Sequence, residues 1–179
     1  MKWLVFLLMI TPATAQTLQK PSSLPPTGNF VYIDQIGNYN TIFVEQTDSG
    51  QKQAAVLSNG DSNNYNVVQS GSGNHTAIIG PTNTSMNSNN SNNTLSIIQS
   101  GSSNNSASIQ LQNSTSNSNN TASITQAGGV GADKQFTLQL QGSGIGATVV
   151  QDSPTTRDSS SMQIICNAPP CTGYSYIKH

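Results

Sequence analysis

The stretch NNTLSIIQSGSSNNSASIQ, residues 92–110, decides the fold expected for this chain. It contains no histidine, cysteine, acidic or basic residue, yet its polar residues are not scattered. Gln99, Gly101, Asn104 and Gln110 fall at fixed intervals, with apolar residues at alternate positions on either side of the glycine. Alternation of this kind is typical of strands with one buried face, and Gly with Asn is typical of the turn between them.

The same arrangement recurs along the chain. Counted through Gln99, it is Asn, five residues, Gln, one, Gly, two, Asn, one, Ser, three, Gln. Residues 29–46 have identical spacing, and 52–69 and 134–151 form weaker copies. Self-similarity at a period of about 23 residues is the signature of a repeat architecture.

Each unit splits into two alternating runs, so a strand, a turn and a second strand form one coil. We predict an all-β protein, an amyloid-like β-solenoid of about six stacked strand-turn-strand coils. The longer links at 79–93 and 112–120 fall at bends inside a coil and are expected to project as flexible polar loops. The expected strand pairs are 30–36 with 41–47, 53–59 with 64–70, 75–80 with 94–100, 105–111 with 121–127, 134–141 with 146–152, and 160–166 with 172–178.

Stacking explains why amides recur at inward positions. Strands paired in register place equivalent side chains in columns about 4.8 Å apart. A buried glutamine or asparagine is costly alone, but in a column its amide donates to one neighbour and accepts from the other. Only the amides at the two ends of a column then lack a neighbour.

One register stays open in the sequence. At 105–111 the apolar residues Ala107, Ile109 and Leu111 are one residue out of phase with Gln110. Either Ser106 and Gln110 point inward, or the bend absorbs a residue. We favour the bend, because buried aliphatic side chains stabilise by roughly 1.5–3 kcal/mol each.

Composition excludes several classes of function. Only 7% of the chain is charged and the formal net charge is −1, so a basic nucleic-acid footprint is absent from the sequence. Low charge with periodic apolar residues favours β-assembly over solvated disorder. His75 and His179 are isolated and the acidic residues are scattered, so we expect no enzymatic activity, metal site or cofactor.

The two ends of the chain depart from the repeat. Residues 1–15 have the charge, apolar run and small residues of a signal peptide cut after Ala15, and the run is far shorter than the roughly 20 residues of a membrane span. The proline-containing segment 16–29 is expected to be a flexible leader, followed by the repeat solenoid at 30–159 and a degenerate last coil at 160–179. We therefore predict an exported protein.

The array of Ser or Asn, five residues, Gln, x, Gly, two, Asn, x, Ala, three, Gln resembles the curlin repeat of bacterial curli fibre subunits. Spacing and residue type agree over 18 positions at 29–46 and again at 93–110, and the resemblance covers about residues 29–151. It implies a secreted subunit that polymerises into amyloid fibres of the cell surface and biofilm matrix. The implied partners are further copies, a related nucleator or subunit, periplasmic chaperones and an outer-membrane export pore, with no nucleic acid required.

The resemblance also assigns roles to individual residues. The inward ladder positions are Gln35, Asn40, Gln46, Asn63, Gln69, Asn93, Gln99, Asn104, Gln110, Gln126 and Gln151. The turn glycines are Gly37, Gly60, Gly71, Gly101 and Gly142.

The last coil raises a separate question. Exported thiols usually pair, so Cys166 and Cys171 are expected to form a disulfide. The coil is then either a partial cap or attachment element, or simply a degenerate repeat. An alternative function for the whole chain is a monomeric solenoid that acts as an adhesin or binds a ligand; a solenoid hydrolase ranks lowest. Monomeric solenoids normally need polar caps, and the sequence shows no charge-rich cap, which favours the fibre.

Overall fold

The computed structural model describes residues 28–80, 89–111, 116–167 and 170–179. The predicted signal peptide and nearly all of the predicted leader therefore lie outside the described residues. In the described ranges every regular element is a strand. No helix among them is long and apolar enough to cross a membrane.

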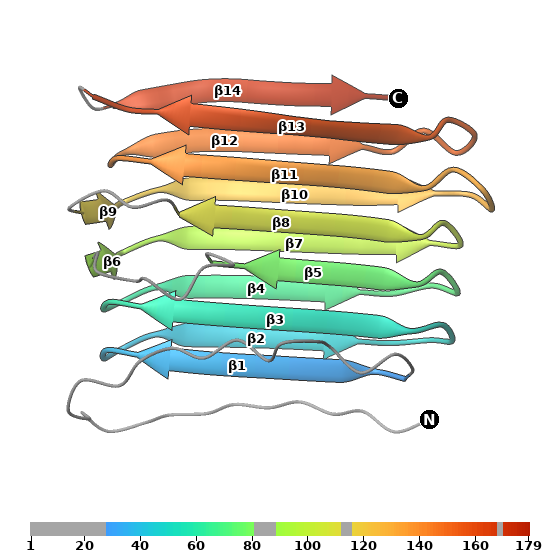
Figure 1. Ribbon diagram of the computed structural model, residues 1–179, viewed down its shortest axis with the longest axis horizontal. Helices are drawn as coiled ribbons and strands as arrows, with labels where there is room; N and C mark the ends of the chain where they lie inside the picture. The colour runs from blue at the N-terminus through green and yellow to red at the C-terminus, as the bar shows by residue number, and fades with distance from the viewer. Residues whose placement is uncertain (1–27, 81–88, 112–115, 168–169) are drawn as a thin grey trace.

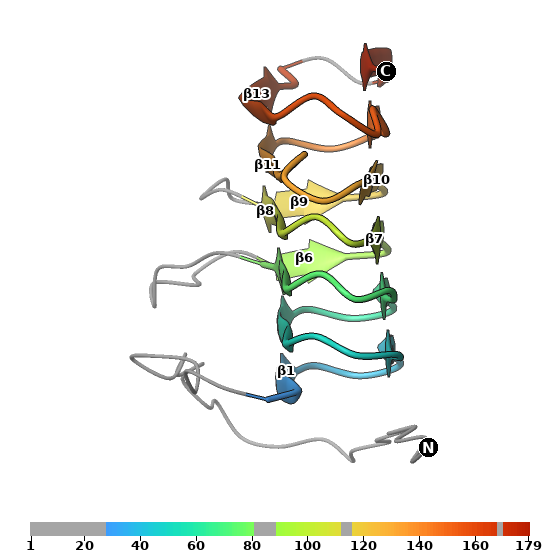
Figure 2. The same ribbon diagram turned by 90° about the vertical axis from the view of Figure 1, so that its right-hand side faces the viewer.

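The strands form two parallel sheets of six strands each, which face one another along the whole stack (Figures 1 and 2). Successive long strands alternate between the sheets, so one strand from each sheet makes one coil. Sheet A contains β1 (Phe30–Ile36), β3 (Lys52–Asn59), β5 (His75–Ile79), β8 (Asn105–Leu111), β11 (Lys134–Gln141) and β13 (Asp158–Ile165). Sheet B contains β2 (Thr41–Gln46), β4 (Asn64–Gln69), β7 (Thr94–Gly101), β10 (Thr121–Gly128), β12 (Ile145–Gln151) and β14 (Cys171–Lys178).

The predicted all-β solenoid is confirmed, and the expected strands agree with the observed ones to within two residues at each end. The prediction of projecting loops at 79–93 and 112–120 is wrong for the part that the structure describes. There β6 (Asn89–Ser91) and β9 (Ser116–Ser118) pair in parallel as a small sheet C, which runs across the space between the two large sheets (Figure 2). Both long bends return to the stack at neighbouring levels, so their backbones can pair like the strands.

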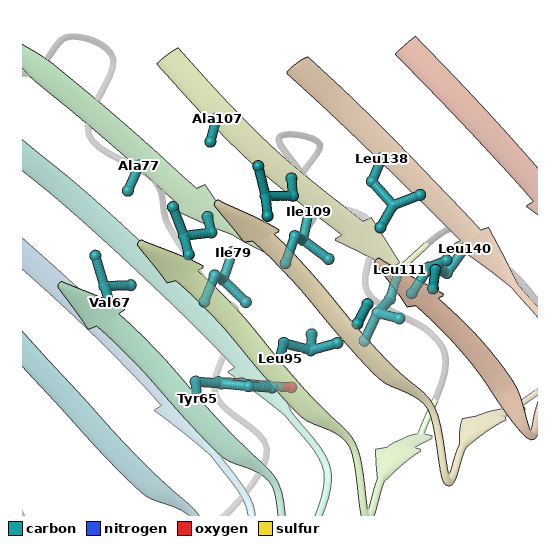
Figure 3. Packing of buried hydrophobic residues seen from close by; sticks show 14 of the residues in the cluster. Tyr65, Val67, Ala77, Ile79, Leu95, Ala107, Ile109, Leu111, Leu138 and Leu140 are labelled. Atoms are coloured by element: carbon teal, nitrogen blue, oxygen red, sulfur yellow. The ribbon is translucent and has the colours of Figure 1, made fainter. Parts of the chain in front are cut away.

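The core lies between sheets A and B and consists of aliphatic columns (Figure 3). Val67 pairs in register with Val44 on one side and with Ile97 on the other, and Ile124 and Val149 continue the same column. In-register pairing places the same face of every strand inward, so the alternation in the sequence becomes a continuous apolar interior.

The open register at 105–111 is settled by burial. Ala107, Ile109 and Leu111 retain only 1%, 0% and 3% of their surface, and they stack against inward residues of β11 such as Leu138. The aliphatic side chains therefore occupy the core, and the bend at 102–104 takes up the difference in phase.

Candidate functional site

A column of glutamine amides runs through the inner face of sheet B. Except at the last member, each Nε2 donates to the Oε1 of the glutamine in the next coil, at 2.8–2.9 Å. The second hydrogen of each Nε2 is donated to a main-chain carbonyl on a strand of sheet A, at 2.9–3.3 Å. The column therefore joins the coils to one another and also joins the two sheets. Its members are Gln46, Gln69, Gln99, Gln126 and Gln151.

A second column of amides follows the bends that lead into sheet B. The Nδ2 of Asn63 donates to Oδ1 of Asn40 at 3.0 Å, and Asn93 donates to Asn63 in the same way at 3.1 Å. These donors point toward the N-terminal end, opposite to the glutamine column. The column ends where Ile145, which has no side-chain amide, donates its main-chain N–H to Oδ1 of Asn120 at 2.9 Å.

Asn120 belongs to this column but was not among the predicted ladder residues. Its main-chain N–H donates to Oδ1 of Asn93 at 3.1 Å, and its Nδ2 donates to the carbonyl oxygen of Gly142 at 3.0 Å. The signal in the sequence is the Asn-Thr pair, which stands at the entry to β2, β7 and β10 alike. The residue before each column asparagine has a left-handed backbone, at φ values of 55° to 59°, and these residues are Tyr39, Ser62, Asn92 and Asn119.

Three predicted ladder residues lie outside the glutamine and asparagine columns. Gln110 is on the outer face of β8, where its Nε2 donates to Oγ of Ser108 at 3.2 Å, because the aliphatic residues of that strand take the inward positions. Gln35 pairs in register with Ser58, so no glutamine stands next to it in its column. Asn104 is exposed, as part of a different column at the opposite bend, where its Oδ1 accepts the N–H of Asn74 at 3.3 Å.

All five predicted turn glycines have positive φ, from 88° to 119°. They lie at two different edges of the stack, because each coil has two bends. At Gly60 a Cβ atom would lie 2.1 Å from the carbonyl oxygen of Asn90 in the next coil. Only glycine permits this approach of the two main chains.

A buried polar column at the start of the sheet A strands was not predicted. Lys52, His75, Asn105, Lys134 and Asp158 stand in register there and are all nearly or fully buried. Each precedes an alternating apolar run, so its inward position follows from parity, but the sequence gives no reason to expect buried charge. This column is part of the structural scaffold.

Two members of this column, Lys52 and His75, are held by main-chain carbonyls. The Nζ of Lys52 donates to the carbonyls of Ser49, Gly71 and Gly73 at 2.6, 2.7 and 3.0 Å. Burial lowers the pKa of Lys52, although the charge of Asp48 opposes the shift. His75 has Nε2 at 2.8 Å from the carbonyl oxygen of Ser70, its Nδ1 is buried without a partner, and burial lowers its pKa to about 4.

The N-terminal end of the stack is open in the described residues. β1 and β2 are the last strands of their sheets, and every residue of β1 is only partly buried. Gln46 donates to Gln69, but within the described part of the chain no group donates to Gln46 Oε1. This end therefore presents strand edges, aliphatic side chains and one amide oxygen.

The C-terminal end is closed by polar groups around Asp158. Its carboxylate accepts hydrogen bonds from Nε2 of Gln151 at 2.6 Å, from the hydroxyl of Tyr176 at 2.8 Å and from Oγ of Ser160 at 2.9 Å. Lys178 Nζ lies 3.6 Å from the same carboxylate. Burial would raise the pKa of Asp158, but these hydrogen bonds and the charge of Lys178 outweigh it and lower that pKa.

The last coil therefore differs from the others in its interior. Tyr174 and Tyr176 stand in register with Ala147 and Val149, and a Cys166–Cys171 disulfide closes the bend between β13 and β14. A second polar pair joins His179 Nδ1 to Asp152 at 2.6 Å. The expectation that no charge-rich cap exists is thus wrong for this end, because residues far apart in sequence meet there.

The described residues hold two directional amide columns and no cluster of metal-ligating side chains. In the described ranges no group of three or more His, Cys, Asp or Glu side chains could hold a metal ion. In each amide column the hydrogen bonds between side-chain amides all run in one direction, and the two ends of the stack differ. We find no match to this chain among protein-family models, curated proteins or solved structures, so the resemblance to the curlin repeat rests on the residues of the repeat alone.

Proposed function

We propose that this chain is a non-enzymatic, exported structural subunit that assembles into curli-like amyloid fibres at the cell surface, where the fibres serve adhesion and biofilm matrix. The observation that carries the proposal is the glutamine column, whose amides repeat from coil to coil and end in Gln46 Oε1, which accepts no hydrogen bond from any described residue. A coil that can stack on its own neighbour can also stack on a coil of another chain.

The proposal also includes the partners that the resemblance implies. These are other copies or a related curlin-type subunit or nucleator in the fibre, and chaperones and an outer-membrane pore during export. A repeat with strand partners 23 to 30 residues apart folds slowly, which is compatible with export before folding.

Seeded assembly tests the proposal. The chain from Gln16 onward, freshly removed from denaturant, is expected to convert to β-structure after a lag that preformed seeds abolish, followed by thioflavin fluorescence and electron microscopy. The physical reason is that nucleation is costly while addition to an existing strand edge is not. A chain that stays monomeric for days at about 10–100 μM, where aggregation-prone intermediates ordinarily associate, would refute the fibre.

A second candidate has one observation in its favour. The polar closure around Asp158 is the kind of cap that monomeric solenoids carry. On that basis the chain would be a monomeric solenoid adhesin or ligand-binding surface protein. The same assembly experiment separates the two, because only the fibre subunit shows seeded growth.

A further inference from the structure

The two ends of the stack are not complementary to one another. Every Nε2 in the glutamine column donates toward the C-terminal end, so the N-terminal end finishes in an acceptor, Gln46 Oε1. A junction that repeats the interior geometry would need a free glutamine N–H from the partner. In this chain the corresponding donor, Nε2 of Gln151, is already bound to the Asp158 carboxylate and to the carbonyl of Gln135.

The last coil offers a poor substitute for that donor. The residue in register beyond Gln151 is Lys178, whose ammonium group is paired with Asp158. Pressing this end against β2 of another copy would bury the ion pair, at a desolvation cost that its Coulomb attraction often fails to repay. The buried ammonium group of Lys52 differs from that of Lys178, because three main-chain carbonyls accept its hydrogen bonds.

Shape opposes the same contact. One interior column is aliphatic throughout and ends in Tyr176; its other members are Val44, Val67, Ile97, Ile124 and Val149. The Tyr176 ring packs against Phe136 with centroids 5.0 Å apart, and its hydroxyl is held by Asp158. These contacts fix the ring in place, so in this column the end face cannot readily adopt the aliphatic packing of an interior coil.

Among residues 28–46, the N-terminal end has none of these obstacles. Its inward residues on the two edge strands are aliphatic or amide, among them Val31, Ile33, Ile42 and Val44. The charged residues of these strands, Asp34 and Glu45, alternate with the inward positions and so face outward. The inward side chains of this face are therefore of the same kinds as those of an interior coil.

We propose that the end formed by β1 and β2 is the docking face of this molecule, and that its partner is a stacked repeat chain whose final coil presents a glutamine amide with a free N–H. A second copy of this chain is a weaker partner, because its last coil is closed by the Asp158 groups and offers no such amide. This inference rests on the proposed fibre function and narrows it: the chain starts or terminates a fibre more readily than it forms the interior.

A binding experiment on full chains tests the inference. The chain from Gln16 onward is tethered through its C-terminus, which leaves the β1–β2 end free. The soluble partner is either the natural sequence or the triple variant Asp158→Asn, Tyr176→Val, Lys178→Gln. The three new side chains repeat those already present in the same columns at Asn105, Val149 and Gln151.

The variant is expected to bind the tethered chain at least about ten-fold more tightly than the natural sequence, since one junction gains an amide and loses a buried ion pair. Gln46→Lys in the tethered chain should abolish the gain. Thr121→Lys, an exposed change of equal charge on the interior strand β10, should leave it intact. Lys178→Gln alone changes a surface position and should act in the same direction, which keeps the test decisive if the triple variant does not fold.

Two results would overturn the inference. Equal binding of the natural and variant partners would show that the last coil is itself a competent face, and no binding of either would show that β1 and β2 are not the docking face. The proposed function is judged separately, by seeded fibre growth of the natural chain. Growth together with equal binding would remove this inference alone, whereas absence of growth in every sequence would remove both.

Discussion

The amide of Gln99 has a partner for each of its hydrogens and for its oxygen. Its Nε2 donates to Gln126 and to the carbonyl of Thr76, both at 2.9 Å, and its Oε1 accepts from Gln69 at 2.9 Å. Gln110, eleven residues later by number, stands on the outer face of its strand. The same residue type in one repeat therefore has two different physical roles.

This difference predicts the cost of two matched substitutions. Gln99→Ala leaves buried donors and acceptors in two neighbouring coils without partners, and should lower the free energy of unfolding by at least about 2 kcal/mol, given 1–3 kcal/mol for each such group. Gln110→Ala should change it by less than about 0.5 kcal/mol, as surface changes usually do. Urea unfolding of the monomer measures both, and equal effects would contradict the assigned register.

His75 predicts how stability depends on pH. Its pKa is about 4 in the folded chain against an ordinary 6.5, so between these values the unfolded chain binds a proton that the folded chain does not. Stability should therefore rise with pH across this window, by up to about 3 kcal/mol, and become independent of this group about one pH unit above 6.5. Urea midpoints between pH 4.5 and about 7 measure the slope.

Two variants identify the source of that slope. His75→Asn places at this level the residue that Asn105 already provides in the same column, and it should flatten the dependence. His179→Gln changes the exposed histidine beside Asp152 and should preserve it. A slope that survives in the first variant would show that another group is responsible.

At the scale of the element, the coil is the unit that can be added or removed. Residues 47–69 span one full coil, because Gln46 and Gln69 are 23 residues apart and adjacent in the glutamine column. In a solenoid each coil contacts only its neighbours, so stability is close to a sum over coils and interfaces. Removing a whole coil rejoins every column, whereas removing half of one does not.

Deletion of residues 47–69 should leave a folded β-protein with a lower urea midpoint, because Gln46 then stacks directly on Gln99. Deletion of residues 52–63, which removes β3 and its bend, is the matched control, since β2 and β4 both belong to sheet B and cannot follow one another in a coil. Circular dichroism and urea titration distinguish them. Loss of cooperative unfolding in both deletions would contradict a modular stack.

At the scale of the whole molecule, the decisive property is that the two ends differ. The described N-terminal end presents aliphatic side chains and an amide oxygen. The C-terminal end presents a carboxylate, an ammonium group and two tyrosines. A head-to-tail fibre joins one end of a molecule to the opposite end of the next, so a poor C-terminal face weakens every junction rather than only one tip. Such interfaces form filaments only when both faces are competent.

The sequence by itself determined the strands, the coils and the inward aliphatic face. Alternation is a local property. In a run such as Val31 to Gln35 it predicts which residues share one face of the strand, whatever that face packs against. The bends followed for the same reason, because positive φ is a property of one residue and glycine adopts it without strain.

Only the tertiary structure decided which amides meet. The series 29–46 and 93–110 have identical spacing, but the first begins in sheet A and the second in sheet B, so equivalent letters occupy opposite halves of a coil. A strand, bend and strand look alike in sequence whichever sheet comes first. This is why Gln110 was misplaced, and why the inward Gln35 has Ser58 rather than a glutamine beside it. The cap around Asp158 was equally hidden, because its charge partners are set by stacking across coils, an interaction between residues distant in sequence.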